Sequence, residues 1–148
     1  METGLLHLHN ILRWVILILL LAAIIKSFSA RSKPDGSMKK ISLFLLIAAH
    51  TQFLIGIYQW FTSSFGYKLI EANGFAEVMK NSTQRFWAIE HITGMFVAIV
   101  LITIARGKVK KQAFSAASGL YIVALLLILS VIPWPFREGI ARPWFPGM

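Results

Sequence analysis

Four long apolar stretches dominate the hydropathy pattern of the chain. They coincide with helices that we expect over about residues 5–28, 41–61, 85–106 and 115–134. Because about 20 consecutive apolar residues cross the hydrocarbon core of a bilayer, each stretch is long enough for one span. Three connections between four spans favour an antiparallel arrangement. The pattern therefore predicts an all-α fold, an integral membrane four-helix antiparallel bundle.

Two segments outside these spans have patterns of their own. In residues 62–84, apolar and charged residues alternate, which predicts a short amphipathic lid lying on the outer surface of the bundle. Residues 135–148 combine repeated Pro and Gly with Trp, Phe and Arg, so a regular helix is not expected there. This tail is either an interfacial anchor or a cap over the outer mouth of the bundle.

Composition restricts the class of protein further. The chain has 148 residues, of which 57% are hydrophobic, and a mean hydropathy of +0.68. These values predict one transmembrane domain over residues 1–148, with no soluble module. Cysteine is absent, which excludes disulfides, iron–sulfur clusters, thiolate metal sites and covalent haem attachment.

The net charge of +9 is unevenly distributed along the chain. The first and third connections are strongly basic, with Lys39, Lys40, Arg106, Lys108 and Lys110 among their cations. Short basic loops stay in the cytoplasm, so both termini are expected on the outer, periplasmic side of a multi-pass protein of the bacterial inner membrane. The basic runs are expected to contact lipid headgroups, and no nucleic acid is expected as a partner.

Glu90 and His91 lie inside the third apolar stretch, where ionisable groups are rare and need a partner. On a helix, His91 and Gly94 fall on the same side, and Glu90 lies beside them. An imidazole next to a residue without a side chain suits a flat macrocycle whose iron is bound by nitrogen. His91 is therefore the first candidate ligand, with Glu90 to orient it and Gly94 to leave room.

The chain has three further histidines: His7 and His9 in the first span and His50 in the middle of the second. His7 and His9 are separated by about 200° around a helix, so only one of them can face the bundle interior fully. The partner of His91 is either His50 on the preceding span or His9, which would lie diagonally across the bundle. A purely structural, hydrogen-bonded role is the alternative for His50.

Arg13 shares a helix face with His9 and lies about 12 Å from the outer end of the first span. An unpaired guanidinium at that depth is costly. Arg13 is therefore expected to pair with Glu90 or with a carboxylate of a bound cofactor, such as a haem propionate. The alternative is that its side chain extends outward to the membrane surface.

Three stretches resemble a family of short four-helix bacterial membrane proteins labelled "cytochrome b". They are LLHLHNILRW at residues 5–14, RFWAIEHITGM at residues 85–95 and the Pro- and Trp-rich tail at residues 133–148, and His50 matches as well. A more distant similarity links the chain to one half of haem A synthase, whose outer cysteine-bearing loop is missing here. The resemblance implies a membrane bundle that holds haem b between histidines.

Three hypotheses follow for function. The first is a protein that binds haem b non-covalently, one haem or two, by paired histidines, and that carries electrons between membrane quinone and a redox partner at the outer face. The second is a haem-free copper, zinc or iron site, or a transport protein, with nitrogen and oxygen ligands from His7, His9, His50, His91 and Glu90. The third is a structural or assembly subunit of a larger membrane complex. No catalytic set of residues is present, so an electron carrier is favoured over a self-contained enzyme.

Overall fold

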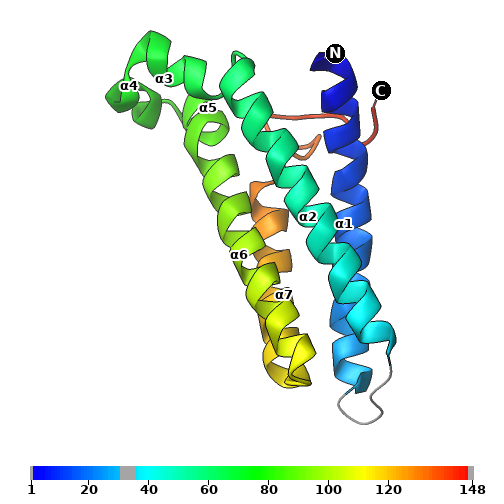
Figure 1. The fold of residues 1–148 in the computed structure, drawn as a ribbon. Helices are drawn as coiled ribbons and strands as arrows, with labels where there is room; N and C mark the ends of the chain where they lie inside the picture. The colour runs from blue at the N-terminus through cyan, green and yellow to red at the C-terminus, as the bar shows by residue number, and fades with distance from the viewer. Residues whose placement is uncertain (1, 31–35, 147–148) are drawn as a thin grey trace.

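The computed structural model describes residues 2–30 and 36–146, and every regular element in them is helical (Figure 1). The long helices are α1 (Glu2–Ala30), α2 (Ser37–Thr62), α6 (His91–Lys110) and α7 (Phe114–Val131). The short elements are α3 (Tyr67–Asn73), α4 (Phe75–Lys80), α5 (Ser82–Arg85) and a π-helical turn η1 (Phe86–Glu90). The predicted all-α class is confirmed for the described part of the chain.

Four segments within the described residues are long and apolar enough to cross a membrane, with mean hydropathies between 1.8 and 2.3. Many of their large apolar side chains remain outside the bundle, for example Ile25, Leu54 and Leu126, each more than 60% exposed. In a bilayer this surface contacts lipid, where exposed apolar groups are favourable. The chain is therefore a multi-pass membrane protein.

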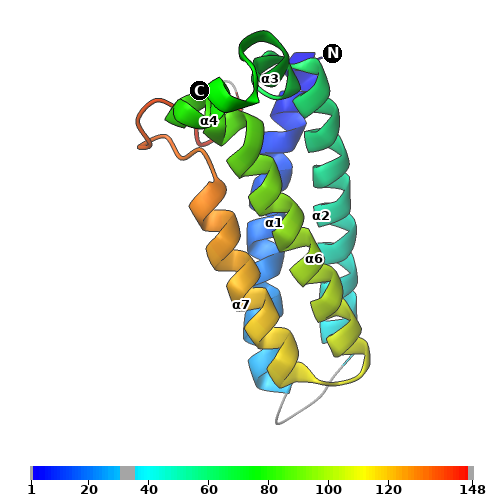
Figure 2. The same ribbon diagram turned by 90° about the vertical axis from the view of Figure 1, so that its left-hand side faces the viewer.

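The long helices form a ring in the order α1, α2, α6, α7, in which each packs against its two neighbours (Figures 1 and 2). This order places α1 diagonally opposite α6. The interior contains the fully buried side chains of Leu20, Leu45, Ile102 and Tyr121, and buried alanines such as Ala98 allow the backbones to approach closely.

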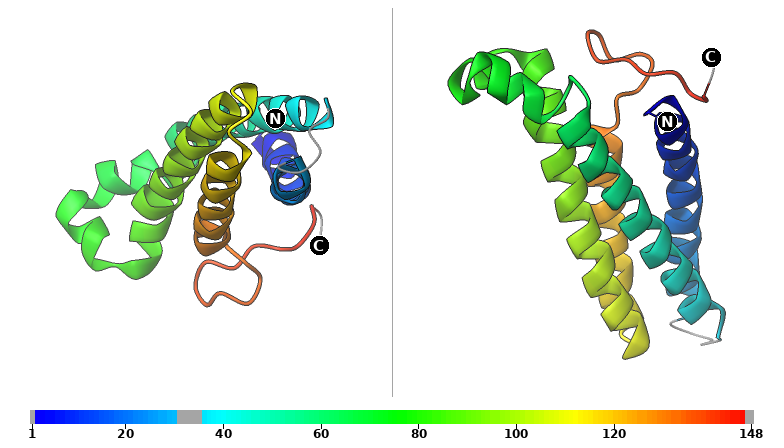
Figure 3. Two further views of the ribbon diagram at one scale, coloured as in Figure 1. Left: turned by 90° about the horizontal axis from the view of Figure 1, so that it is seen from below. Right: turned by 45° about the horizontal axis from the view of Figure 1, so that its top comes forward.

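The short elements α3, α4 and α5 lie at the end of the bundle where the described chain begins and ends (Figure 3). They occupy the segment expected as a lid. α4 is held there by the buried Val78. The π turn that follows α5 contains Ala88, whose carbonyl accepts a hydrogen bond from Trp60 Nε1 at 2.8 Å. Trp60 thus connects α2 to the start of the third span.

The tail leaves α7 at Val131, before Trp134, because a residue preceding a proline disfavours helical backbone and Pro133 follows Ile132. From there it runs across the end of the bundle to α1 (Figure 3). Trp14 Nε1 donates to the Trp144 carbonyl at 2.7 Å, and the two indoles stack. The tail is therefore docked on α1.

Candidate functional site

His9 and His91 face each other inside the bundle, near the end that carries the tail. Their ring centroids are 6.4 Å apart, and the ring planes meet at 63°. His9 comes from α1, and His91 is the first residue of α6, the diagonally opposite helix. Both side chains are half-buried. Of the two pairings that the sequence left open, the structure forms the diagonal one.

The orientation of His91 is fixed by the end of α7. His91 Nδ1 lies 2.7 Å from the carbonyl oxygen of Val131, the last residue of that helix. A carbonyl oxygen only accepts, so Nδ1 carries the hydrogen and Nε2 keeps its lone pair. The last carbonyls of a helix lack a helical N–H, and His91 supplies one to α7. The same bond leaves Nε2 in the form that binds a metal.

His9 lies against a part of α2 that has no bulky side chain. A Cβ atom added to Gly56 would come 3.4 Å from His9 Cε1, which is van der Waals contact, so the imidazole lies directly against the helix at this glycine. One turn away, Gln52 Nε2 donates to the His9 carbonyl at 2.7 Å. Two other atoms, His9 Nδ1 and Gln52 Oε1, are buried without a hydrogen-bond partner in the described structure. The site therefore contains two buried polar atoms that are available for a hydrogen bond with a ligand.

Gly56 and Gln52 were not among the ligand candidates from sequence. Their separation of four residues is the only sequence signal, since it places them on one helix face, away from that of His50. A glycine and an amide at this spacing are too common to identify a site without the partner helix.

The space beside Gly94 is filled by α7. A Cβ at Gly94 would lie 2.6 Å from Val131 Cγ1, so α6 and α7 are in direct contact there. The expectation that Gly94 leaves an open surface for a ring system is wrong in this structure. Its lack of a side chain serves close helix packing instead.

His50 is not part of the site. It is exposed on the surface of α2, and its Nδ1 donates to the Leu46 carbonyl of the same helix at 2.8 Å. The alternative pairing of His50 with His91 is therefore not formed. His7 is half-buried on α1, and its position two residues before His9 turns it to another side of that helix.

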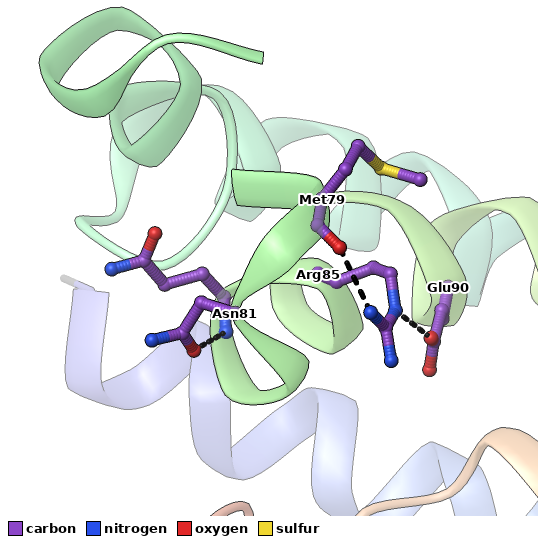
Figure 4. A network of polar contacts seen from close by, with 5 residues as sticks. Met79, Asn81, Arg85 and Glu90 are labelled. Atoms are coloured by element: carbon purple, nitrogen blue, oxygen red, sulfur yellow. Dashed lines mark hydrogen bonds and ion pairs between the residues drawn. The ribbon is translucent and has the colours of Figure 1, made fainter. Parts of the chain in front are cut away.

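Arg13 and Glu90 do not pair with each other. Arg13 Nη2 donates to the Trp144 carbonyl at 2.8 Å and to the Pro143 carbonyl at 3.3 Å. Glu90 Oε1 instead accepts from Arg85 Nε at 2.7 Å, as Figure 4 shows. The guanidinium of Arg85 also donates through Nη1 to the Met79 carbonyl at 2.8 Å, at the end of the lid.

The π turn explains why Glu90 lies outside the pair. A π-helical turn contains more residues than an α-helical one, so the side chains before and after it are rotated relative to a continuous α-helix. Glu90 closes this turn and points to Arg85, whereas His91 opens α6 and points inward. π turns are rare and occur frequently at functional sites, so the junction between η1 and α6 is consistent with a site at His91.

The described residues contain no group of three or more His, Cys, Asp or Glu side chains able to hold a metal ion. The haem-free metal site expected from four histidines is therefore reduced to the imidazole nitrogens of His9 and His91.

Comparisons with models of protein families, with curated proteins and with solved structures found no match.

Proposed function

We propose that the protein binds one haem b non-covalently and carries electrons in the bacterial inner membrane. The observation that supports this is the His9–His91 pair, two imidazoles from diagonally opposite helices with centroids 6.4 Å apart. Metal–imidazole bonds of about 2 Å put the centres of two rings on opposite sides of one ion on the order of 6 Å apart. The pair therefore has the spacing that ligation by both rings requires.

The two nitrogen donors of the pair suit a haem iron better than a small ion. Two nitrogen ligands without a thiolate are sufficient for a b-type haem iron, whereas structural zinc takes four protein ligands. His91 is held in the ligating form by Val131, and His9 lies against Gly56, where no side chain intervenes. The buried His9 Nδ1 and Gln52 Oε1 offer hydrogen bonds that the described chain does not use.

The other residues of this end have separate roles in the proposal. When bound, haem supplies one-electron redox chemistry. Gln52 holds the backbone of His9, and the π turn directs His91 inward. Arg13 provides positive charge one turn from His9, which favours an anionic substituent nearby. We further propose that this end faces the periplasm, because the opposite end carries the basic connections, and that quinone and an outer redox partner exchange electrons with the site.

The test is a visible spectrum of the detergent-purified protein, oxidised and then reduced with dithionite. We expect a Soret band and reduced α and β bands that disappear in His91→Ala and weaken strongly in His9→Ala. The matched control is His50→Ala, which removes an imidazole outside the pair and is expected to keep the spectrum. A normal Soret band in His91→Ala contradicts the proposal.

A second function is favoured by the contact between Gly94 and Val131. This contact, together with the His91–Val131 hydrogen bond, is what a histidine used only to fix helix register would make. In that case the protein is a structural or assembly subunit of a membrane complex. It is then colourless and free of metal even after expression with excess haem, and it copurifies with other membrane proteins.

A further inference from the structure

Three polar side chains from three helices lie near the end of the bundle opposite the histidine pair, and two of them are in contact. Arg106 of α6 donates through Nη1 to Ser42 Oγ of α2 at 3.0 Å. Tyr121 of α7 is fully buried and lies seven residues, about 10 Å, after the start of its helix at the same end of the bundle. Ser42 is also fully buried. These residues form a polar cluster inside the membrane-spanning part of the bundle.

Two hydrogen-bond donors of this cluster have no acceptor. Arg106 Nε and Tyr121 Oη are both buried without a hydrogen-bond partner in the described residues. Ser42 cannot serve both, because its hydroxyl already donates to the Lys39 carbonyl at 2.9 Å and accepts from Arg106. Buried donors without an acceptor are costly and rare. The cluster therefore lacks an oxygen acceptor that something outside these residues provides.

The charge of this end points to an anion. Within residues 2–30 and 36–146, the carboxylate residues belong to elements at the opposite end, namely Glu2, Glu71, Glu77, Glu90 and Glu138 (Figure 1). The end with Arg106 instead carries Lys39, Lys40, Lys108 and Lys110. A guanidinium stays charged in proteins. Arg106 is thus an intramembrane cation with no carboxylate of the described chain at its end of the bundle.

The depth of the cluster suits a lipid headgroup. Arg106 lies four residues before the end of α6 at Lys110, which is roughly 6 Å along the helix. A long basic side chain at this depth reaches the interface between hydrocarbon and headgroups. Arg106 is only half-buried, so part of it remains open to such a partner. Basic pockets between spans on the cytoplasmic side bind anionic lipid headgroups.

We propose that Arg106, supported by Ser42 and Tyr121, binds the phosphate oxygens of an anionic phospholipid headgroup at this end of the bundle. The guanidinium offers planar, charged donors that match phosphate geometry. The Tyr121 hydroxyl adds a neutral donor, to the phosphate or to a water ordered by it. The surrounding lysines attract the headgroup but do not define the site. This inference does not depend on haem.

The experiment measures thermal unfolding by intrinsic tryptophan fluorescence in neutral detergent after delipidation. The purified full-length protein is titrated separately with phosphatidylglycerol, phosphatidylcholine and inorganic phosphate. We expect phosphatidylglycerol to raise Tm and phosphatidylcholine to raise it much less. In Arg106→Gln, the apparent affinity for phosphatidylglycerol should fall about tenfold or more, as the loss of a charge-assisted hydrogen bond predicts.

Two variants make the test specific. Lys110→Gln removes the same charge from the exposed end of α6, and we expect less than about a threefold change in affinity because exposed charges contribute little. Tyr121→Phe removes only the hydroxyl and should weaken binding several-fold, and it carries the test if Arg106→Gln does not fold. The proposal is overturned if Arg106→Gln and Lys110→Gln lose affinity equally. If Arg106→Gln does not fold, it is overturned by an unchanged affinity in Tyr121→Phe. Equal stabilisation by phosphatidylcholine overturns it as well, and equal stabilisation by inorganic phosphate assigns the site to the free anion instead of a lipid.

Discussion

His91 and His50 make nearly the same hydrogen bond, yet the structure gives them different roles. Each donates Nδ1–H to a backbone carbonyl, at 2.7 Å for His91 and 2.8 Å for His50. The acceptor of His50 is Leu46 of its own helix, so the bond only satisfies the imidazole on an exposed surface. The acceptor of His91 is Val131 of another helix, and this bond turns the ring toward His9. The two histidines are therefore distinguished by the helix that supplies the acceptor: another helix for His91 and its own helix for His50.

The largest expected difference between the two histidines is in stability. His91→Ala removes a contact between α6 and α7 and leaves the Val131 carbonyl without its donor, so we expect a loss of about 2–4 kcal/mol in the free energy of unfolding. His50→Ala removes a local bond on an exposed face and should cost less than about 0.5 kcal/mol. Reversible unfolding in mixed micelles measures both. Equal losses would remove the distinction drawn from the two acceptors.

Gly94 tests whether close packing of α6 on α7 supports His91. In Gly94→Ala the new Cβ meets Val131 Cγ1 at 2.6 Å, so the helices must separate at the position that holds the imidazole. We expect a loss of about 1–3 kcal/mol, the usual cost of overpacking. The control is Gly107→Ala on the same helix, where nothing lies within 4 Å of the added atom. That variant should be stabilised by about 0.5–1 kcal/mol through helix propensity. If Gly94→Ala is as stable as its control, Val131 is not a rigid neighbour.

The sequence predicted the spans well but not the direction in which their polar groups face. Span positions depend on long apolar runs, and these are unambiguous. The direction in which a side chain points can be predicted only from an amphipathic pattern, and α2 and α6 are apolar on nearly all sides. The outward position of His50 could therefore not be predicted from the sequence. The π turn before His91 rotates the residues on either side of it, and no residue type marks such a turn, so the choice of Arg85 over Arg13 as the partner of Glu90 was also hidden.

Arg13 is a half-buried cation, and its hydrogen-bond partners come from the tail and not from the expected Glu90. The acceptors are the carbonyls of Pro143 and Trp144, and such groups carry no sequence signal. Trp14 adds a stacked ring and its own hydrogen bond to Trp144. A backbone acceptor supplied by a segment more than 100 residues away can be found only from the fold.

Arg13→Gln is expected to release the tail from α1. It removes charge-assisted bonds to two carbonyls and a cation–π contact with Trp14 at 5.1 Å, together worth about 1–2 kcal/mol. Chymotrypsin should then cut faster after Trp144, whose carbonyl is released from Arg13, and mass spectrometry of the product detects the cut. The control is Arg85→Gln, whose ion pair lies on the lid and not on the tail. Unchanged cleavage in Arg13→Gln would mean that the aromatic stacking alone holds the tail.

The smallest expected effect concerns the turn that directs His91. Trp60→Phe keeps an aromatic ring beside Phe61 and Tyr67 but removes the donor to the Ala88 carbonyl inside the π turn. The loss of one buried hydrogen bond predicts about 0.5–1.5 kcal/mol. Because the turn immediately precedes His91, the NMR signals of its ring should shift in protein with ¹⁵N-labelled histidine, while those of His50 should stay in place. A shift of both rings would show that Trp60 supports α2 as a whole and does not act through the turn.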